Sequence, residues 1–169
     1  MKKIILIALF ICGMQLQAQK TFKLINLTAN TVTIDDLITY TGGTGTGAFP
    51  QFHSKPNGAV NIAPFGTYTL TTTNLTRFPF FSPTSTPTIN SWERATSATS
   101  STVISSTVAF PLGAAQVFYW VQVRIGANTK HLGVVGSGYT PGPITSNGWT
   151  ASYLQNGTIA APIYTVTIP

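Results

Sequence analysis

The sequence predicts an all-β fold, a single antiparallel β-sandwich in which two sheets pack face to face. β-branched and aromatic residues recur in short runs, turn residues separate the runs at fairly even intervals, and no stretch keeps a helical apolar period. We expect about 8–10 short strands in an Ig-like or jelly-roll-like arrangement. Two sheets are favoured because several strands carry one apolar face, which needs a second layer to cover it.

Residues 1–18 have the layout of a secretory signal peptide. Two lysines precede an apolar run over residues 4–11, and the small residue Ala18 follows as a cleavage point. The apolar run is shorter than the ~20 residues that a membrane-spanning helix needs. We therefore expect a cleaved leader and export from a bacterial cytoplasm to the periplasm, the cell surface or the medium. A retained anchor and lipid attachment at Cys12 are the alternatives.

Residues 19–169 are predicted to form one domain without a linker or repeat. Its length suffices for an ordinary apolar core. Cys12 is the only cysteine and lies in the leader, so the exported domain has no disulfide and no cysteine ligand for a metal.

Charged residues are scarce, at 7% of the chain against ~25% in an average soluble protein. Threonine, about one residue in six, supplies much of the polar surface instead. The leader lysines account for two of the six net positive charges, which leaves about +4 spread thinly over the domain. Because nucleic-acid binding needs a clustered basic patch, we do not expect DNA or RNA as a partner.

The first strands are predicted on Phe22–Ile25 and Thr31–Asp35, joined as an opening hairpin by the turn residues between them. The glycine-rich stretch Thr41–Gly47 is predicted to be a loop. In Thr67–Thr73, Tyr68 and Leu70 alternate with threonines, which predicts one buried face and one solvated face.

Three Asn-Gly pairs predict tight hairpin turns, because both residues tolerate the positive φ of a type I′ turn. Asn156-Gly157 is the clearest pair and should join Trp149–Gln155 to Thr158–Ala161. The others are Asn57-Gly58 and Asn147-Gly148.

The strongest strand signal is Ala115–Ile125, which we place inside a sheet. Val117, Tyr119, Val121, Val123 and Ile125 should share one face, with Phe118 and Trp120 opposite them.

Weaker signals surround this strand. Ser82–Ser106 is predicted to be a long connection with a helical turn or two within Asn90–Ser100 and a weak strand at Thr102–Val108. Lys130–Gly136 and Ile163–Ile168 complete the predicted strands.

Titratable residues give little basis for catalysis. The only acids are Asp35, Asp36 and Glu93, and the aspartates should point to opposite faces of a strand. His53 and His131 belong to no recognisable nucleophile motif or metal-ligand spacing, and solvated loop positions are their expected fate. We predict a noncatalytic protein without metal or cofactor. A cleft that held Glu93 beside an aspartate and a histidine would contradict this prediction.

Four aromatic residues are candidates for ligand binding, because they fall in or beside predicted loops. Flat rings there can stack on sugars, with Asn and Thr donating hydrogen bonds around them. Packing at the ends of the sandwich is the competing interpretation. The four are Trp92, Tyr139, Trp149 and Tyr153.

Phe78, Phe80 and Phe81 surround a proline that excludes a regular central strand. Either the rings cover the core as a lid, or they form an exposed hydrophobic contact for a partner or membrane. The Ser/Thr-rich segment beside them has a composition similar to the insertion hairpins of β-pore-forming toxins, which makes membrane activity one alternative.

The sequence therefore predicts an exported protein for adhesion or extracellular assembly. Few charges protect its sheet edges, so association with itself is physically easy. Carbohydrate binding through the loop aromatics is the main alternative and is compatible with adhesion. A pore-forming protein and a hydrolase are the further alternatives. The expected partners are other copies of the chain or a glycan.

Overall fold

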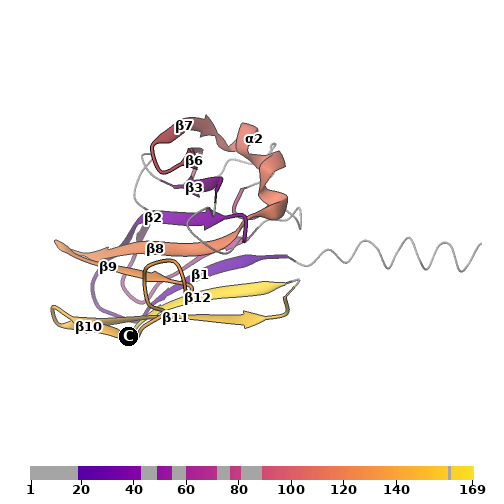
Figure 1. The fold of residues 1–169 in the computed structure, drawn as a ribbon. Coiled ribbons are helices and arrows are strands. Elements are labelled where there is room, and N and C mark those ends of the chain that lie inside the picture. Colours follow the sequence, from indigo (N-terminus) through magenta and orange to yellow (C-terminus); the bar gives the residue numbers. More distant parts are fainter. Residues whose placement is uncertain (1–18, 43–48, 55–59, 72–76, 81–88, 160) are drawn as a thin grey trace, which may run out of the picture.

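The computed structural model describes residues 19–42, 49–54, 60–71, 77–80, 89–159 and 161–169, which form two stacked β-sheets (Figure 1). The predicted leader, residues 1–18, lies outside the described residues. Sheet A has the spatial order β10, β11, β12, β1, β5. The bounds of its strands are Ile144–Ser146 (β10), Trp149–Gly157 (β11), Pro162–Ile168 (β12), Thr21–Asn26 (β1) and Thr67–Thr71 (β5).

Sheet B has the spatial order β7, β6, β3, β2, β8, β9, and β4 pairs with one end of β2. The bounds of its strands are Ser100–Ser105 (β7), Ser91–Ser97 (β6), Gln51–His53 (β3), Val32–Tyr40 (β2), Val117–Ile125 (β8), Asn128–Gly133 (β9) and Val60–Ile62 (β4). The predicted all-β, two-sheet sandwich is confirmed. The described residues hold twelve strands, more than the predicted number, because three of them are only three residues long.

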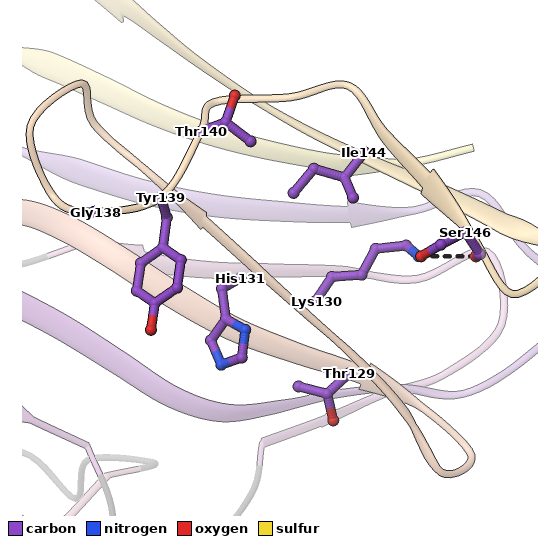
Figure 2. A pocket seen from close by; sticks show the side chains of 8 residues that line it. All are labelled: Thr129, Lys130, His131, Gly138, Tyr139, Thr140, Ile144 and Ser146. Atoms are coloured by element: carbon purple, nitrogen blue, oxygen red, sulfur yellow. Dashed lines mark hydrogen bonds between the residues drawn. The ribbon is translucent and has the colours of Figure 1, made fainter.

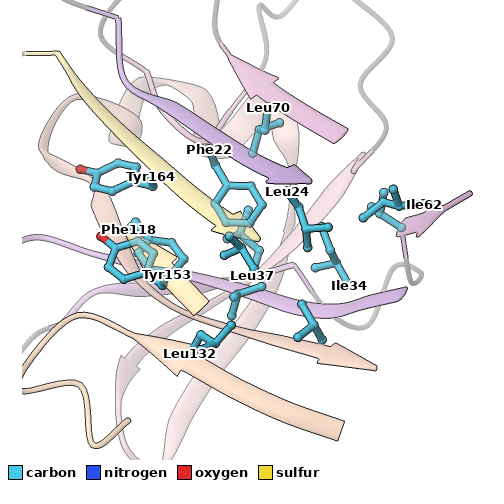
Figure 3. Packing of buried hydrophobic residues seen from close by; sticks show 14 of the residues in the cluster. Phe22, Leu24, Ile34, Leu37, Ile62, Leu70, Phe118, Leu132, Tyr153 and Tyr164 are labelled. Carbon is cyan, nitrogen blue, oxygen red and sulfur yellow. The ribbon is translucent and has the colours of Figure 1, made fainter. Parts of the chain in front are cut away.

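The core lies between the sheets and is built by side chains that alternate with solvated ones. Figure 3 shows Phe22 and Leu24 of β1 facing Ile34 and Leu37 of β2 across the interlayer space. Phe118 of β8 stacks near its centre, and its ring centroid is 5.6 Å from that of Phe22. Burial of each such side chain is worth about 1.5–3 kcal/mol, so an ordinary core can hold a domain without disulfides.

The predicted opening hairpin is wrong, because β1 and β2 belong to different sheets. β1 pairs in parallel with β12 and antiparallel with β5. The buried Asn26 makes the change of sheet possible: its Oδ1 accepts from the Thr28 backbone N–H at 3.0 Å, and its Nδ2 donates to Ala63 O at 2.9 Å. The amide thus satisfies the backbone where the chain crosses between layers.

The predicted helical turn within Asn90–Ser100 is also wrong. That segment forms β6, with Trp92 buried against the core, and it pairs with both β3 and β7. The strand expected at Thr102–Val108 ends at Ser105, whose side chain accepts from Val108 N and caps the short helix α2 (Ser106–Ala109). A 3₁₀ helix, η1 (Phe110–Ala115), follows. None of the described helices is long and apolar enough to cross a membrane.

The Asn147-Gly148 hairpin is confirmed between β10 and β11, with φ angles of 52° and 77°. Asn156-Gly157 does not form the turn predicted for it. β11 continues to Gly157, which pairs with Pro162, so the connection follows the Asn-Gly pair rather than containing it. Asn57-Gly58 and most of the predicted Thr41–Gly47 loop lie outside the described residues.

Strand β8 lies inside sheet B as predicted, but its two faces are not those that strict alternation predicts. Its pairing with β2 shifts register between Trp120 and Phe118, so Tyr119 is an extra residue. This bulge turns Phe118 inward together with Val121 and Val123. Trp120 alternates with the inward Val121 and faces outward, and this orientation positions the candidate site.

Candidate functional site

A pocket of about 530 Å³ lies where β9, an edge of sheet B, approaches β10, an edge of sheet A. The chain between these strands crosses from one layer to the other and forms one wall (Figure 2). The pocket is lined by Thr129, Lys130 and His131 of β9, by Gly138, Tyr139 and Thr140 of the connection, and by Ile144 and Ser146 of β10.

The pocket has an aromatic wall. Tyr139 is 39% exposed, and its ring stacks on His131 with a centroid distance of 4.8 Å and an interplanar angle of 13°. Trp120 supports both rings from the outer face of β8, with its centroid 4.9 Å from that of Tyr139. Figure 2 shows the tyrosine and histidine rings side by side. The arrangement keeps a flat ring partly in water and fixes its direction.

The local backbone explains why Tyr139 is held in this position. The connection bends at Gly136 and Gly138, whose φ angles of 92° and 87° suit glycine. The Tyr139 backbone N–H donates to Ser137 Oγ at 3.3 Å, and Gly133 N donates to Thr140 O at 3.2 Å. The first bond holds the turn at Tyr139, and the second joins the connection to the end of β9.

His131 of β9 contributes one ring of the aromatic wall and also contacts the neighbouring strand β8. Its Nε2 lies 3.3 Å from Oε1 of Gln122, the residue opposite it on β8. Burial lowers the pKa of His131 below its usual value of 6.5. The imidazole is therefore mostly neutral at pH 7, which suits a ring that stacks and shares a hydrogen bond.

Lys130 forms the inner side of the pocket and is only 3% exposed. Its Nζ donates to Ser146 O at 2.8 Å and to the Ser146 hydroxyl, and it lies 4.1 Å from the ring centroid of Trp149. Desolvation lowers the pKa of Lys130. The ammonium thus bridges the two sheets beneath an exposed serine.

A second hollow, of about 470 Å³, lies on the outer face of sheet B and is lined in part by His53 and Glu93. The two residues are direct neighbours across β3 and β6. His53 Nδ1 lies 3.0 Å from Oδ2 of Asp36, which is 2% exposed. Glu93, an aspartate and a histidine therefore follow one another across three strands, the arrangement that opposes a noncatalytic interpretation.

The geometry of this row is not that of a nucleophile relay. Ser54 Oγ donates to Asp36 Oδ1 at 3.4 Å, so serine and histidine bind the same carboxylate instead of each other. Within the described chain the Glu93 side chain forms no hydrogen bond or ion pair. No group of three His, Cys, Asp or Glu residues among the described residues is arranged to hold a metal ion.

The two neighbouring aspartates turn to different strands. Asp35 forms an ion pair with Arg124 of β8, at 2.9 Å between Oδ2 and Nε, while Asp36 pairs with His53 of β3. Asp35 is the extra residue of a register shift in β2. The two aspartate side chains therefore do not alternate between the faces of β2 as expected. Their carboxylates still bind different residues and do not form one site.

Of the four aromatic candidates, Tyr139 lines the pocket and Trp149 lies behind it under Lys130. Trp92 is 0% exposed and donates from Nε1 to Ser106 Oγ, and Tyr153 is 9% exposed and stacks on Phe118 at 4.8 Å. The expectation of loop positions open to a ligand is corrected for these two. Both lie on strands whose inward face carries them into the core.

Phe78 and Phe80 are also core residues, which corrects the exposed-contact interpretation for them. The Phe80 ring lies 4.9 Å from Phe52 and 5.2 Å from Trp92, both measured between centroids. Phe78 packs 5.6 Å from Tyr164. These two rings cover the core as the lid interpretation predicts, while Phe81 lies outside the described residues.

Sequence reasoning did not bring Lys130 and His131 together as parts of one pocket or place Trp120 against its aromatic rings. The adjacent pair Lys130-His131 offered a signal, since successive strand residues serve the two sides of an edge strand.

No family model, no curated protein and no solved structure matches this chain.

Proposed function

We propose that this protein is an exported, noncatalytic carbohydrate-binding domain that acts in adhesion. The observation that carries the proposal is the partly exposed Tyr139 ring, held against His131 and Trp120 at a pocket with hydroxyl groups on its walls. Sugars bind through this combination, because their C–H faces stack on aromatic rings while their hydroxyls exchange hydrogen bonds with polar side chains. Export rests on the leader-like residues 1–18.

The distribution of acids supports a noncatalytic role. Asp35 and Asp36 are held in pairs with Arg124 and His53, and Glu93 lies on β6, outside the Tyr139 pocket. Glycoside hydrolysis requires two carboxyl groups flanking one bond. The residues that line the Tyr139 pocket include no carboxylate.

The proposal is tested by screening the domain on a glycan array and measuring the best ligand by calorimetry with Tyr139→Ala. An aromatic contact of about 1.5 kcal/mol predicts a loss of affinity of about tenfold. Tyr139→Phe keeps the ring and should retain most of the affinity. Phe65→Ala removes an exposed ring from the turn between β4 and β5 and is the matched control. Absence of any glycan ligand, or equal binding by Tyr139→Ala, would contradict the proposal.

Self-assembly is a second candidate, favoured by the edge strand β7. Its six residues, Ser100–Ser105, carry no charge, and all except Ile104 are exposed. An uncharged edge strand leaves backbone N–H and C=O groups open to pairing with another chain. Adhesion through a glycan and assembly through this edge are compatible, because the pocket and β7 lie at opposite ends of sheet B.

A further inference from the structure

Lys130 is a buried cation for which the chain supplies no anion. The protein has only three acidic side chains, and all three are among the described residues. Asp35 and Asp36 pair with other residues, and Glu93 is on β6, four strands from β9 in the sheet order. No acidic side chain therefore neutralises the Lys130 ammonium.

The groups that do contact Lys130 are all neutral. A backbone carbonyl and a hydroxyl of Ser146 accept its hydrogen bonds, and the face of Trp149 lies beside it. These contacts satisfy the donors but leave a full positive charge in a poorly hydrated place, which is unfavourable for an unpaired ion. The lowered pKa of Lys130 has the same cause. An uncharged donor would bridge the strands without this cost.

The Lys130 ammonium lies where a ligand in the pocket can reach it. The side chain runs along the Tyr139 pocket and ends at Ser146, an exposed residue on the rim (Figure 2). An anionic group that enters beside Ser146 would meet the ammonium where little water screens it, so the attraction would be strong.

We propose that the pocket selects acidic glycans, and that Lys130 provides the counter-charge for a carboxylate or sulfate group on the sugar. This inference rests on the proposed carbohydrate-binding function and names its substrate class. Tyr139 stacks on the sugar ring, and the Ser146 hydroxyl and Lys130 Nζ donate to the anionic group.

The test uses an array that carries uronic-acid and sulfated oligosaccharides beside neutral ones of the same ring type. We expect acidic members to bind best, and the separate uronate and sulfate arms identify the anion. Calorimetry then compares an oligogalacturonate with its methyl ester, which has no charge, or the equivalent pair for the ring type found. The acid should bind at least about ten times more tightly than the ester. Added salt should lower the affinity for the acid and leave the affinity for the ester unchanged.

Lys130→Met should remove this preference, with a loss of about tenfold or more for the acid and little change for the ester. Lys23→Met is the matched control, because it removes the same charge from β1, outside the pocket. We expect Lys130→Met to melt at or above the wild-type temperature, since it removes an uncompensated buried charge. Lys130→Gln keeps hydrogen-bonding capacity and provides a second neutral variant should the first fail to fold.

The outcomes separate the two proposals. Preference for neutral glycans, or unchanged acid binding in folded Lys130→Met and Lys130→Gln, would overturn the acidic specificity and leave carbohydrate binding standing. Failure to bind any glycan overturns both. Acid binding that is lost equally in Lys23→Met would show a nonspecific charge effect and also overturn the role of Lys130.

Discussion

Among single residues, the two neighbouring aspartates offer the sharpest comparison of buried and exposed charge. Asp36 is 2% exposed and pairs with His53, while Asp35 and Arg124 form a more exposed pair at the surface of sheet B. Removing Asp36 leaves the buried groups that contact it, on His53 and Ser54, without their acceptor, whereas surface ion pairs contribute little.

We expect Asp36→Ala to lower the free energy of unfolding by roughly 2–3 kcal/mol, because buried polar groups lose their acceptor. Asp35→Ala should cost much less than Asp36→Ala, because water screens the pair that Asp35 forms with Arg124. Urea denaturation followed by tryptophan fluorescence measures both values. Equal effects of the two substitutions would contradict the difference in environment that we describe.

At the scale of the strand, the edge strand β7 is where two copies of the domain could pair through their backbones. Natural edge strands are commonly blocked by an inward or outward lysine. Val103 is 55% exposed on β7 and lies directly opposite Glu93 of β6. A lysine at this position would face a carboxylate that has no partner within the described chain, so the substitution is compatible with the fold.

Val103→Lys is expected to reduce self-association of the domain at high concentration, while melting stays close to that of the wild type. Val108→Lys introduces the same charge at another exposed valine, on α2 rather than on the edge strand, and should leave association unchanged. Sedimentation velocity over a concentration series measures the effect. A strictly monomeric wild type would remove the basis for assembly.

At the scale of the whole molecule, tyrosines in and around the core link stability to alkaline pH. Burial raises the pKa of Tyr68 and of Tyr164 to about 12. It also raises that of Tyr153, with smaller contributions from Tyr164 and Tyr40. In the unfolded chain tyrosine ionises near pH 10, as it does in short unstructured peptides. The unfolded state therefore loses protons first as the pH rises.

The free energy of unfolding should accordingly be level below about pH 10 and fall as the pH rises from there toward 12. Denaturant titrations at a series of pH values measure this slope. Tyr68→Phe should make the fall shallower, and it also removes a buried hydroxyl for which the described residues supply no hydrogen-bond partner. Stability that stays level to pH 12 would show that these hydroxyls are not buried as described.

The sequence alone determined the all-β class, the two layers, the faces of Thr67–Leu70 and the turn at Asn147-Gly148. Each of these depends on residues close together in the chain: a two-residue alternation reports burial, and Asn-Gly reports its own backbone angles. Tyr139 could be proposed as a site residue for the same reason, because an aromatic residue among glycines indicates a loop.

Only the tertiary structure decided which sheet each strand joins and what the pocket contains. The parallel pairing of β1 with β12 joins residues from opposite ends of the chain, and the inward turn of Phe118 depends on the register of β8 against β2. The pocket itself forms between edges of different sheets, and the unpaired charge of Lys130 follows from where the acids lie. These features arise from contacts distant in sequence, for which local patterns carry no information.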